Sequence, residues 1–321
     1  MASDFWPLNT ALYVRDFKGS DPKFVAYFLR RLPWSNFVDK AAVPGVNRNH
    51  VHLLEVSLPK LDEQRRIAAV LGALDDKIEL NRKMNRTLEE MAQALFKSWF
   101  IDFDGVPPSD LIDSALGPIP KGFRRTTLAE LASLNPESWS KSSRPPTVEY
   151  LDLSSTKWGR IEGTSLYDSK DAPSRAQRVL RIGDTVVGTV RPGNGSYALI
   201  LRDGLTGSTG FAVLRPKASI HRSFVYLAAT SGTNIERLEH LADGGAYPAV
   251  RPDVVAATEI VCGDESSMRS FAAVVDPVLE RIEANERQSR TLAELRDTLL
   301  PKLISGELRV PDAEALAEAA L

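Results

Sequence analysis

The chain contains very little cysteine: Cys262 is the single one among 321 residues. One cysteine can form neither an internal disulfide nor a multi-cysteine zinc site, and we expect the reducing cytoplasm as its compartment. The sequence has no apolar run of the roughly 18 residues that a membrane-spanning helix requires. It also has no basic stretch followed by a hydrophobic one at its N-terminus, so a signal peptide is not expected.

Histidine is also scarce, with four residues in the chain. His50 and His52 would share one face of a strand, but no third ligand is nearby in the sequence, so we expect a surface pair and no metal site. Ser154–Lys157 has a Ser-x-x-Lys pattern without its companion motifs, and Gly207–Gly210 is neither a P-loop nor a dinucleotide fingerprint. The sequence has no acidic nuclease cluster and no methyl-donor motif either. It predicts a non-enzymatic chain without a cofactor.

The charge is nearly balanced overall but unevenly distributed. The chain carries 40 Lys and Arg against 42 Asp and Glu. Residues 117–222 hold 16 basic against 9 acidic side chains, whereas residues 263–321 hold 7 against 12. A basic middle in a neutral chain is typical of a localised anion-binding surface, although chance variation in surface composition would give the same pattern.

An internal repeat organises the chain. A shift of 204 positions aligns Ile78–Asn81 with Ile282–Asn285, and a shift of 200 aligns Phe24 and Val25 with Phe224 and Val225. The chain is therefore interpreted as two copies of one unit, each ending in the same helix. The first copy is roughly 85 residues shorter at its front, so we expect its globular part to lack most of the N-terminal half.

Two long helices are predicted, the first over about 62–103 and the second at the equivalent place in the second copy. Their apolar residues are spaced by four and three positions, which is typical of a heptad seam between long helices. A buried asparagine in such a seam costs stability but fixes register. We expect the two helices to pack antiparallel against each other, with two amphipathic helices on separate cores as the alternative. The predicted seam residues are Ile67, Leu71, Leu74, Ile78, Asn81, Leu88, Leu95, Phe271, Val275, Ile282, Asn285, Leu292 and Leu299.

Between the helices the pattern is that of a mixed α/β globule. Val148–Leu153, Asp184–Val190 and Tyr197–Leu201 are strand-like and are separated by turn signals. Phe224–Ala229 and Asn234–Leu241 have a helical pattern.

Basic, polar and aromatic residues lie at the predicted turns of this globule. Arginine and asparagine can bond to base edges in DNA, and lysines and hydroxyls position phosphates. A solvated loop would explain any one of these residues, but their combination in the basic part of the chain favours DNA binding. The predicted contacts are Lys157, Arg160, Arg175, Arg191, Asn194, Tyr197, Ser208, Tyr247 and Arg251.

Several stretches are typical of one protein family. They are Leu58–Ile67, the helix from Ile78 to Trp99, Phe100–Asp104, Gly117–Phe123, Thr189–Pro192, Ser208–Pro216, Gly245–Val250 and Leu299–Leu308. Over nearly the whole chain they resemble the DNA specificity (S) subunits of type I restriction-modification systems. The resemblance implies two target recognition domains joined by two antiparallel helices that act as a ruler between the half-sites of a bipartite DNA target.

The resemblance also implies an organisation and a set of partners. The expected fold is α+β, with one intact α/β recognition domain and a partial one joined by two long helices in an antiparallel coiled coil. The expected partners are double-stranded DNA, modification (methyltransferase) subunits and restriction subunits, with self-association through the long helices as a further possibility and no membrane. The expected parts are a remnant of the first recognition domain (1–61), the first long helix (62–104), a linker (105–116), the second recognition domain (117–263), the second long helix (264–305) and a C-terminal tail (306–321).

The missing front of the first domain leaves two rival interpretations. The chain could be an interaction protein that occupies modification subunits without full bipartite recognition. It could instead pair with itself or with another fragment and read a symmetric target. An independent enzyme is the least favoured alternative.

Overall fold

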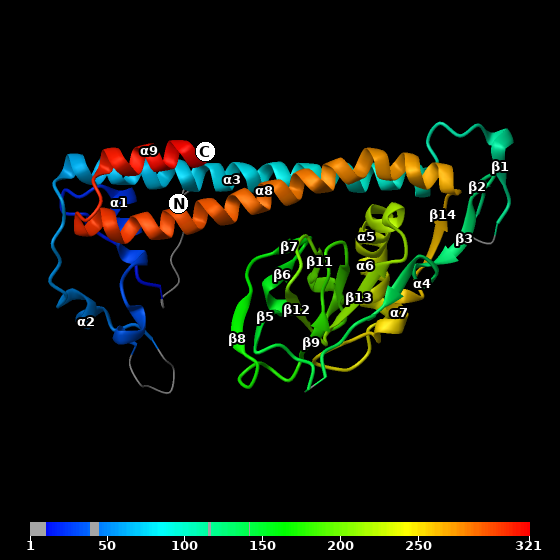
Figure 1. Ribbon diagram of the computed structural model, residues 1–321, viewed down its shortest axis with the longest axis horizontal. Coiled ribbons are helices and arrows are strands. Elements are labelled where there is room, and N and C mark those ends of the chain that lie inside the picture. Colours follow the sequence, from blue (N-terminus) through cyan, green and yellow to red (C-terminus); the bar gives the residue numbers. More distant parts are fainter. Residues whose placement is uncertain (1–10, 39–44, 115–116, 141) are drawn as a thin grey trace. The chain divides into compact units, whose positions relative to one another are not determined.

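A computed structural model describes residues 11–38, 45–114, 117–140 and 142–321 (Figure 1). The chain divides into two compact units, one formed by Met1–Lys83 with Asn285–Leu321 and the other by Met84–Ala284. The long helices α3 (Leu61–Lys97) and α8 (Glu265–Ser305) each contribute a segment to both units.

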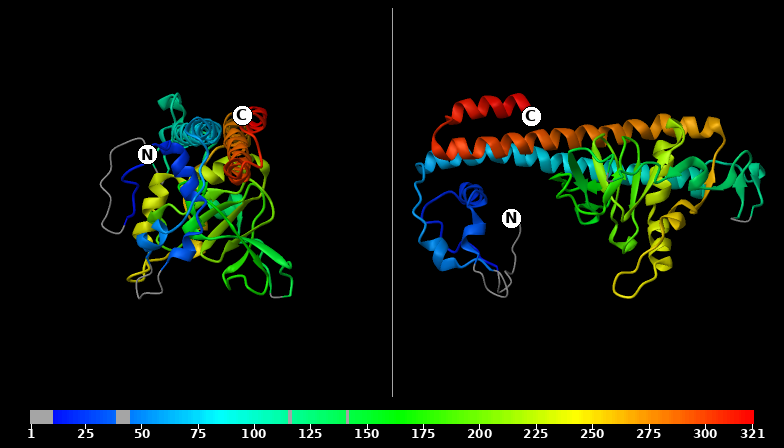
Figure 2. Two further views of the ribbon diagram at one scale, coloured as in Figure 1. Left: turned by 90° about the vertical axis from the view of Figure 1, so that its left-hand side faces the viewer. Right: turned by 60° about the horizontal axis from the view of Figure 1, so that its bottom comes forward.

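In the first unit, α3 and α8 lie side by side and run in opposite directions (Figures 1 and 2). Asp75 of α3 meets Arg296 of α8, with 2.5 Å between Oδ1 and Nη1. Six positions later along α3, Asn81 meets Asn285, which lies earlier along α8. The apolar seam residues between these polar contacts belong to one buried core. The α+β fold with two long antiparallel helices is therefore confirmed.

The predicted seam positions differ in how deeply they are buried. Ile67, Leu71, Leu74, Ile78, Asn81, Phe271, Val275, Asn285, Leu292 and Leu299 are buried. Leu88, Leu95 and Ile282 are half-buried.

Two seam asparagines hydrogen-bond across the helix pair, one in each unit. In the first unit, Asn81 Nδ2 donates to the carbonyl of Asn285 at 3.3 Å and to Ser289 Oγ at 3.2 Å. In the second unit, Asn85 Nδ2 donates to the carbonyl of Ile282 at 3.3 Å. A buried amide finds these partners in one alignment of the helices, so each asparagine fixes the register.

The short helix α1 (Pro22–Arg30) completes the core of the first unit. Its Phe24 is buried beside the α3–α8 seam, and its Tyr27 hydroxyl donates to Asp75 Oδ2 at 2.7 Å. Burial alone would raise the pKa of Asp75, but the hydrogen bonds from Tyr27 and Arg296 outweigh it and hold that pKa below its ordinary value. This carboxylate therefore joins α1, α3 and α8.

The C-terminal segment forms a helix that was not predicted. Where the sequence suggested a tail, α9 (Val310–Ala320) packs on α3 and α8 of the same unit. Its Val310, Ala313 and Ala317 are buried along one face, and its Glu314 pairs with Arg66 of α3 at 3.1 Å. Alanine and glutamate are strong helix formers, but a single row of small side chains gives little periodic signal in the sequence.

In the second unit, the described residues form two four-stranded sheets. The first is antiparallel in the order β11 (Tyr197–Leu199), β10 (Thr185–Gly188), β13 (Phe211–Pro216), β4 (Ala132–Leu134). The second has the order β8 (Ser165–Asp168), β5 (Thr147–Leu151), β12 (Leu205–Ser208), β9 (Ala176–Val179), with β5 and β12 parallel. One buried cluster, which includes Leu151, Val186 and Phe211, contains residues from both sheets.

Smaller elements complete this globule. The strand pairs are β1 (Leu111–Ile112) with β2 (Ile119–Pro120), β3 (Arg124–Thr127) with β14 (Glu259–Cys262), and β6 (Thr156–Lys157) with β7 (Arg160–Ile161). The helices are α4 (Leu128–Leu131), α5 (Arg222–Thr230), α6 (Gly232–Leu241) and α7 (Pro252–Ala256). Part of the expected linker is thus paired, because β1 lies within it.

The structure repeats itself as the sequence does. Helix α1 corresponds to α5 at a shift of 200 residues. Helix α2 (Arg48–His52) corresponds to α7 at a shift of 204 residues. His50 and His52 therefore lie in a short helix, and the expectation that they lie in a strand was wrong. Among the helices that the structure describes, none is long and apolar enough to cross a membrane.

An aromatic cluster attaches the globule to the long helices within the second unit. The ring of Phe100 lies 4.7 Å from Phe224 of α5 and 4.9 Å from Phe271 of α8, nearly perpendicular to both. Phe96 joins the same cluster. The π-helical turn Ser98–Asp102 carries Phe100. It alters the α-helical phase of its side chains, which explains why Phe100 was missed as a seam position.

A buried carboxylate makes a second attachment. Glu89 of α3 accepts a hydrogen bond from the Tyr226 hydroxyl of α5 at 2.8 Å. Burial raises the pKa of Glu89 above its ordinary value, and the hydrogen bond from Tyr226 opposes that rise. Gln93, one turn further along α3, donates to Thr230 Oγ1 at 3.2 Å.

We predict that Phe100→Ala lowers the free energy of unfolding by about 3–5 kcal/mol, because it leaves a cavity among three aromatic rings. Chemical denaturation of the full chain measures this. The control is Ile101→Ala at the next, exposed position, where we expect a loss below about 1 kcal/mol. Equal losses in the two variants would contradict the assigned role of the cluster.

We predict that Glu89→Gln changes the free energy of unfolding more favourably at pH 8 than at pH 5, relative to the unmodified chain. A carboxyl whose pKa is raised by folding binds its proton more tightly in the folded state, so its stabilising contribution is present at low pH and is lost as pH rises through the raised pKa. Glutamine removes this dependence and keeps an acceptor for Tyr226. Denaturation at both pH values, compared with Glu90→Gln at the neighbouring exposed position, checks the difference. An unchanged pH dependence would contradict it.

Candidate nucleic-acid interface

The β6–β7 hairpin presents two exposed cations. Its two-residue turn consists of Trp158 and Gly159, which have φ values of 48° and 80°. Positive φ at both central residues is the geometry of the type I′ turn that closes tight hairpins. Lys157 and Arg160 flank this turn and are exposed, and neither forms an ion pair with an acidic side chain in the described part of the chain.

A second loop, residues 191–196, is joined to this hairpin. The Trp158 N–H donates to the carbonyl of Gly195 at 2.7 Å, and the Gly159 N–H donates to that of Tyr197 at 3.0 Å. Arg191, at the start of the loop, has a left-handed φ of 48°. Asn194 is exposed in the short helical turn Pro192–Asn194.

A third loop, residues 243–251, packs on the second. Arg191 Nη2 donates to the carbonyl of Ala246 at 2.7 Å, and its guanidinium lies over the Tyr247 ring at 4.7 Å from the centroid. A bridge between Val190 and Ala249 joins the two backbones. We call residues 157–160, 191–196 and 243–251 the loop cluster. It brings together Lys157, Arg160, Arg191, Asn194, Tyr247 and Arg251.

Burial removes two predicted contacts from this set. Ser208 has no exposed surface, and its hydroxyl accepts a hydrogen bond from the Gly210 N–H at 3.2 Å. Tyr197 is 9% exposed and lies under the Trp158 ring. Neither side chain can reach DNA without rearrangement, so both predicted contacts were wrong. Alternation along a strand does not reveal this, because β12 and β11 are buried on both faces.

The remaining predicted contacts lie at the surface. Arg175 is exposed just before β9, and its carbonyl accepts a hydrogen bond from the Thr209 N–H at 2.8 Å. Arg251 is exposed and pairs with Asp253 at 3.2 Å. Trp158 is an exposed aromatic residue of the cluster that sequence reasoning did not select, although its place between Lys157 and Arg160 was a usable signal.

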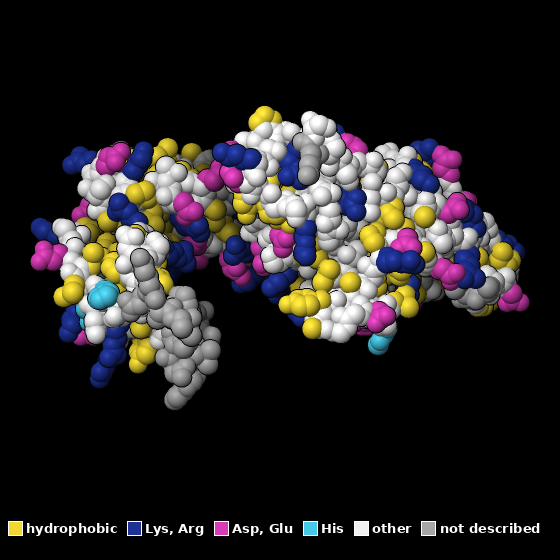
Figure 3. Space-filling model, turned by 90° about the horizontal axis from the view of Figure 1, so that it is seen from below, with side chains coloured by type: hydrophobic (Ala, Val, Ile, Leu, Met, Phe, Trp, Pro, Cys, Tyr) yellow, Lys and Arg dark blue, Asp and Glu magenta, His cyan; other side chains and the backbone are white. Residues whose placement is uncertain are grey.

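Several basic side chains of residues 117–222 pair with carboxylates inside the globule. Arg215 Nε pairs at 2.7 Å with Asp184, whose side chain is fully buried, and Arg215 also contacts Glu137. Hydrogen bonds from Arg181 and Arg215 lower the pKa of Glu137 to about 2. Figure 3 shows Lys and Arg side chains dispersed among acidic and apolar ones on the face that it draws. On that face the basic side chains do not form one broad area.

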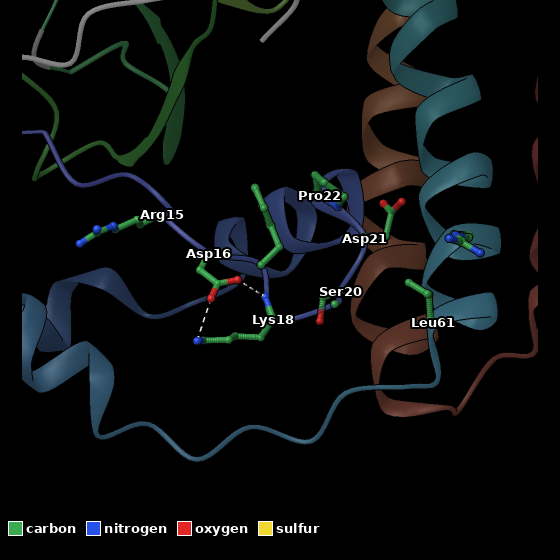
Figure 4. A pocket seen from close by; sticks show the side chains of 10 residues that line it. Arg15, Asp16, Lys18, Ser20, Asp21, Pro22 and Leu61 are labelled. Atoms are coloured by element: carbon green, nitrogen blue, oxygen red, sulfur yellow. Dashed lines mark hydrogen bonds and ion pairs between the residues drawn. The ribbon is translucent and has the colours of Figure 1, made fainter.

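A separate pocket lies in the first unit, at Arg15–Pro22 with Leu61 and Arg65 (Figure 4). It is an open hollow of about 420 Å³. Lys18 pairs with Asp16 at 2.7 Å within it, so part of its charge is already neutralised. Within the described ranges, no group of three or more His, Cys, Asp or Glu side chains could hold a metal ion.

Comparisons with known proteins point to one family. Residues 4–90 match the type I restriction modification DNA specificity domain. The chain is 24% identical over 281 residues to the type I restriction enzyme MjaIX specificity subunit of Methanocaldococcus jannaschii, a match that covers 84% of this chain and 64% of the relative. It is 23% identical over 337 residues to the HindI specificity subunit of Haemophilus influenzae, covering 83% of this chain and 71% of the relative.

Among solved structures, a type I restriction-modification system S subunit from M. genitalium aligns with a TM-score of 0.49 at 16% identity, covering 88% of this chain and 72% of that one. The assignment rests on the sequence matches, since the matched domain and both relatives carry the same designation. The chain is similar over residues 4–90 to the type I restriction modification DNA specificity domain, and over most of its length to type I restriction enzyme specificity subunits.

Proposed function

We propose that the chain recognises a double-stranded DNA sequence as the specificity subunit of a type I restriction-modification assembly, in which partner subunits methylate adenine and restrict DNA. The chain itself is a non-catalytic component and works in the cytoplasm. The observation that carries this proposal is the loop cluster, where side chains suited to DNA project from three loops that hydrogen bonds hold together.

The chemistry of the cluster divides between phosphates and bases. Lys157 and Arg160, which flank the exposed hairpin turn, suit contacts to the phosphate backbone. Arg191 uses one terminal nitrogen for the Ala246 carbonyl and keeps further donors, since a guanidinium has five N–H groups. With the exposed Asn194, it suits paired hydrogen bonds to guanine or adenine edges.

The long helices suit a spacer that also binds partner proteins. The aromatic cluster ties the globule to them in the second unit, so a recognition domain would be held at a fixed place along the helices. Exposed apolar side chains lie along both helices, at Leu80, Met91 and Val274. Such side chains support a surface for modification subunits, with restriction subunits joining the larger assembly.

A second candidate function is supported by the first copy of the repeat. Leu12 and Tyr13 are 54% and 63% exposed, whereas their counterparts in β13, Ala212 and Val213, are almost fully buried. A segment that is a core strand in one copy and exposed in the other favours pairing with a second polypeptide. In that case two chains would together read a symmetric target, or the chain would bind modification subunits without full recognition.

We predict that the double variant Lys157→Ala/Arg160→Ala weakens binding to mixed-sequence duplex DNA and lowers the slope of log affinity against log salt by about 2, because each phosphate contact releases about one counterion. Filter retention of the full chain with its modification subunit across a salt series measures both quantities. The control is Lys170→Ala, an exposed lysine beyond β8 in the same globule, for which we expect little change. Salt-independent binding of the unmodified protein would count against the interface.

We predict that cells producing this chain with its modification subunit carry methylated adenine in a bipartite sequence motif. Methylation sequencing of their genome checks this and separates the two candidates. A bipartite motif with unlike halves supports recognition by one chain, and a symmetric motif supports pairing of two chains. Absence of any methylated motif would leave the chain as an interaction protein and would overturn both recognition proposals.

A further inference from the structure

Trp158 occupies a backbone conformation that hairpin turns usually give to other residues. It is the first central residue of the β6–β7 turn, with a φ of 48°. Type I′ turns strongly favour asparagine, aspartate or glycine at this position, and a bulky side chain with positive φ is an outlier that costs free energy. Such outliers gather at functional sites, because the surrounding structure must hold them in place.

The surroundings of Trp158 fix it firmly. Its ring meets that of Tyr197 edge to face, with centroids 6.0 Å apart. The backbone N–H of Trp158 donates to the Gly195 carbonyl. A Cβ atom on Gly195 would lie 2.5 Å from the indole ring, so residue 195 must be glycine for the ring to lie there. On the other side of the turn, a Cβ on Gly159 would lie 2.9 Å from the Tyr226 hydroxyl, which is bound to Glu89.

Despite this support, Trp158 remains 58% exposed. Filling the core does not explain the residue, since more than half of its side-chain surface faces solvent. Packing against Tyr197 alone would not require a tryptophan in a strained turn. The chain therefore holds a large rigid aromatic side chain at the surface, in a conformation that local preference opposes.

The neighbours of Trp158 indicate what it contacts. Lys157 and Arg160 lie on either side of it along the hairpin, and within the described residues neither has an acidic partner in an ion pair. Arg191, in the loop to which Trp158 is bonded, also has a φ of 48°. The hairpin and the adjoining loop thus carry two residues with a strained backbone and two cations without an acidic partner. Such a surface suits a DNA groove, where phosphates flank the base edges and some base edges are apolar.

We propose that Trp158 inserts into a DNA groove as a specificity-determining residue, making an apolar contact with base edges while Lys157 and Arg160 hold the flanking phosphates. The indole contributes discrimination between base pairs, and the cations contribute affinity that does not depend on sequence. This inference rests on the proposed function, since it specifies one contact of the DNA interface.

The test compares Trp158→Asn with the unmodified protein by selection from a pool of random-sequence duplexes, using the full chain with its modification subunit. Asparagine suits the left-handed turn, so the hairpin keeps its conformation, and circular dichroism checks folding. We expect total affinity for the unselected pool to stay within about twofold, while preference at one or more base pairs of the enriched motif falls about tenfold. Leu166→Ala, at an exposed apolar residue of β8 in the same globule, is the matched control and should leave the motif unchanged.

A second measurement needs no variant. Hydroxyl-radical labelling followed by mass spectrometry should show Trp158 protected several-fold by a duplex of the enriched sequence and less by an unrelated duplex. Equal labelling with and without the enriched duplex would overturn the proposal.

The outcomes distinguish a failure of this inference from a failure of the proposed function on which it rests. If Trp158→Asn enriches the same motif with the same strength, the inference fails and the function stands. If the variant loses its modification subunit and keeps its motif, Trp158 is a protein contact and the inference also fails. If the unmodified protein enriches no motif, the proposed function itself fails.

Discussion

Each long helix carries an apolar stripe, and burying that stripe against the other helix is the constraint on which both units depend. An isolated amphipathic helix is marginal in water because most helical stability comes from tertiary packing. In the first unit the seam is closed by α1 and α9, whose Phe24 and Ala313 are fully buried beside it. In the second unit the stripe carries Phe96, Phe100 and Phe271, and the core of the globule continues from these rings. The globule is therefore packed on the helices through its own core.

Polar side chains between the helices and their neighbours fix this packing in one register. The amide of Asn81 reaches the Asn285 carbonyl in one register, and the Asp75 carboxylate holds Tyr27 and Arg296 together. The carboxylate of Glu89 holds Tyr226, which lies directly behind Gly159 at the hairpin turn. A chain of contacts thus leads from a long helix to the exposed Trp158. Any change that displaced α3 from the globule would also displace the side chains that we assign to DNA.

The distribution of charge shows why composition alone overstates a binding surface. The arginines of residues 117–222 include Arg202 and Arg215, which pair with Glu149, Glu137 and Asp184 to hold the strands together. Their charge is neutralised locally and contributes little to the field outside. A count of basic residues therefore overstates the charge that is available to a ligand at the surface.

The sequence by itself determined the repeat, the two long helices with their apolar stripes and the basic α/β globule, because heptad spacing is visible within one helix and the repeat is visible when the chain is compared with itself. The antiparallel packing of the two helices was an expectation that the structure decided. It did not reveal α9, whose row of alanines has weak periodicity, or the role of Phe100, which depends on the π-helical turn at Ser98–Asp102. It also placed Ser208 and Tyr197 at the surface, although both lie in strands buried on two faces. The loop cluster unites residues about 35 to 90 positions apart in the chain through backbone hydrogen bonds and a stacked arginine. Only the tertiary structure could decide that these loops meet, because no local pattern encodes contacts between distant turns.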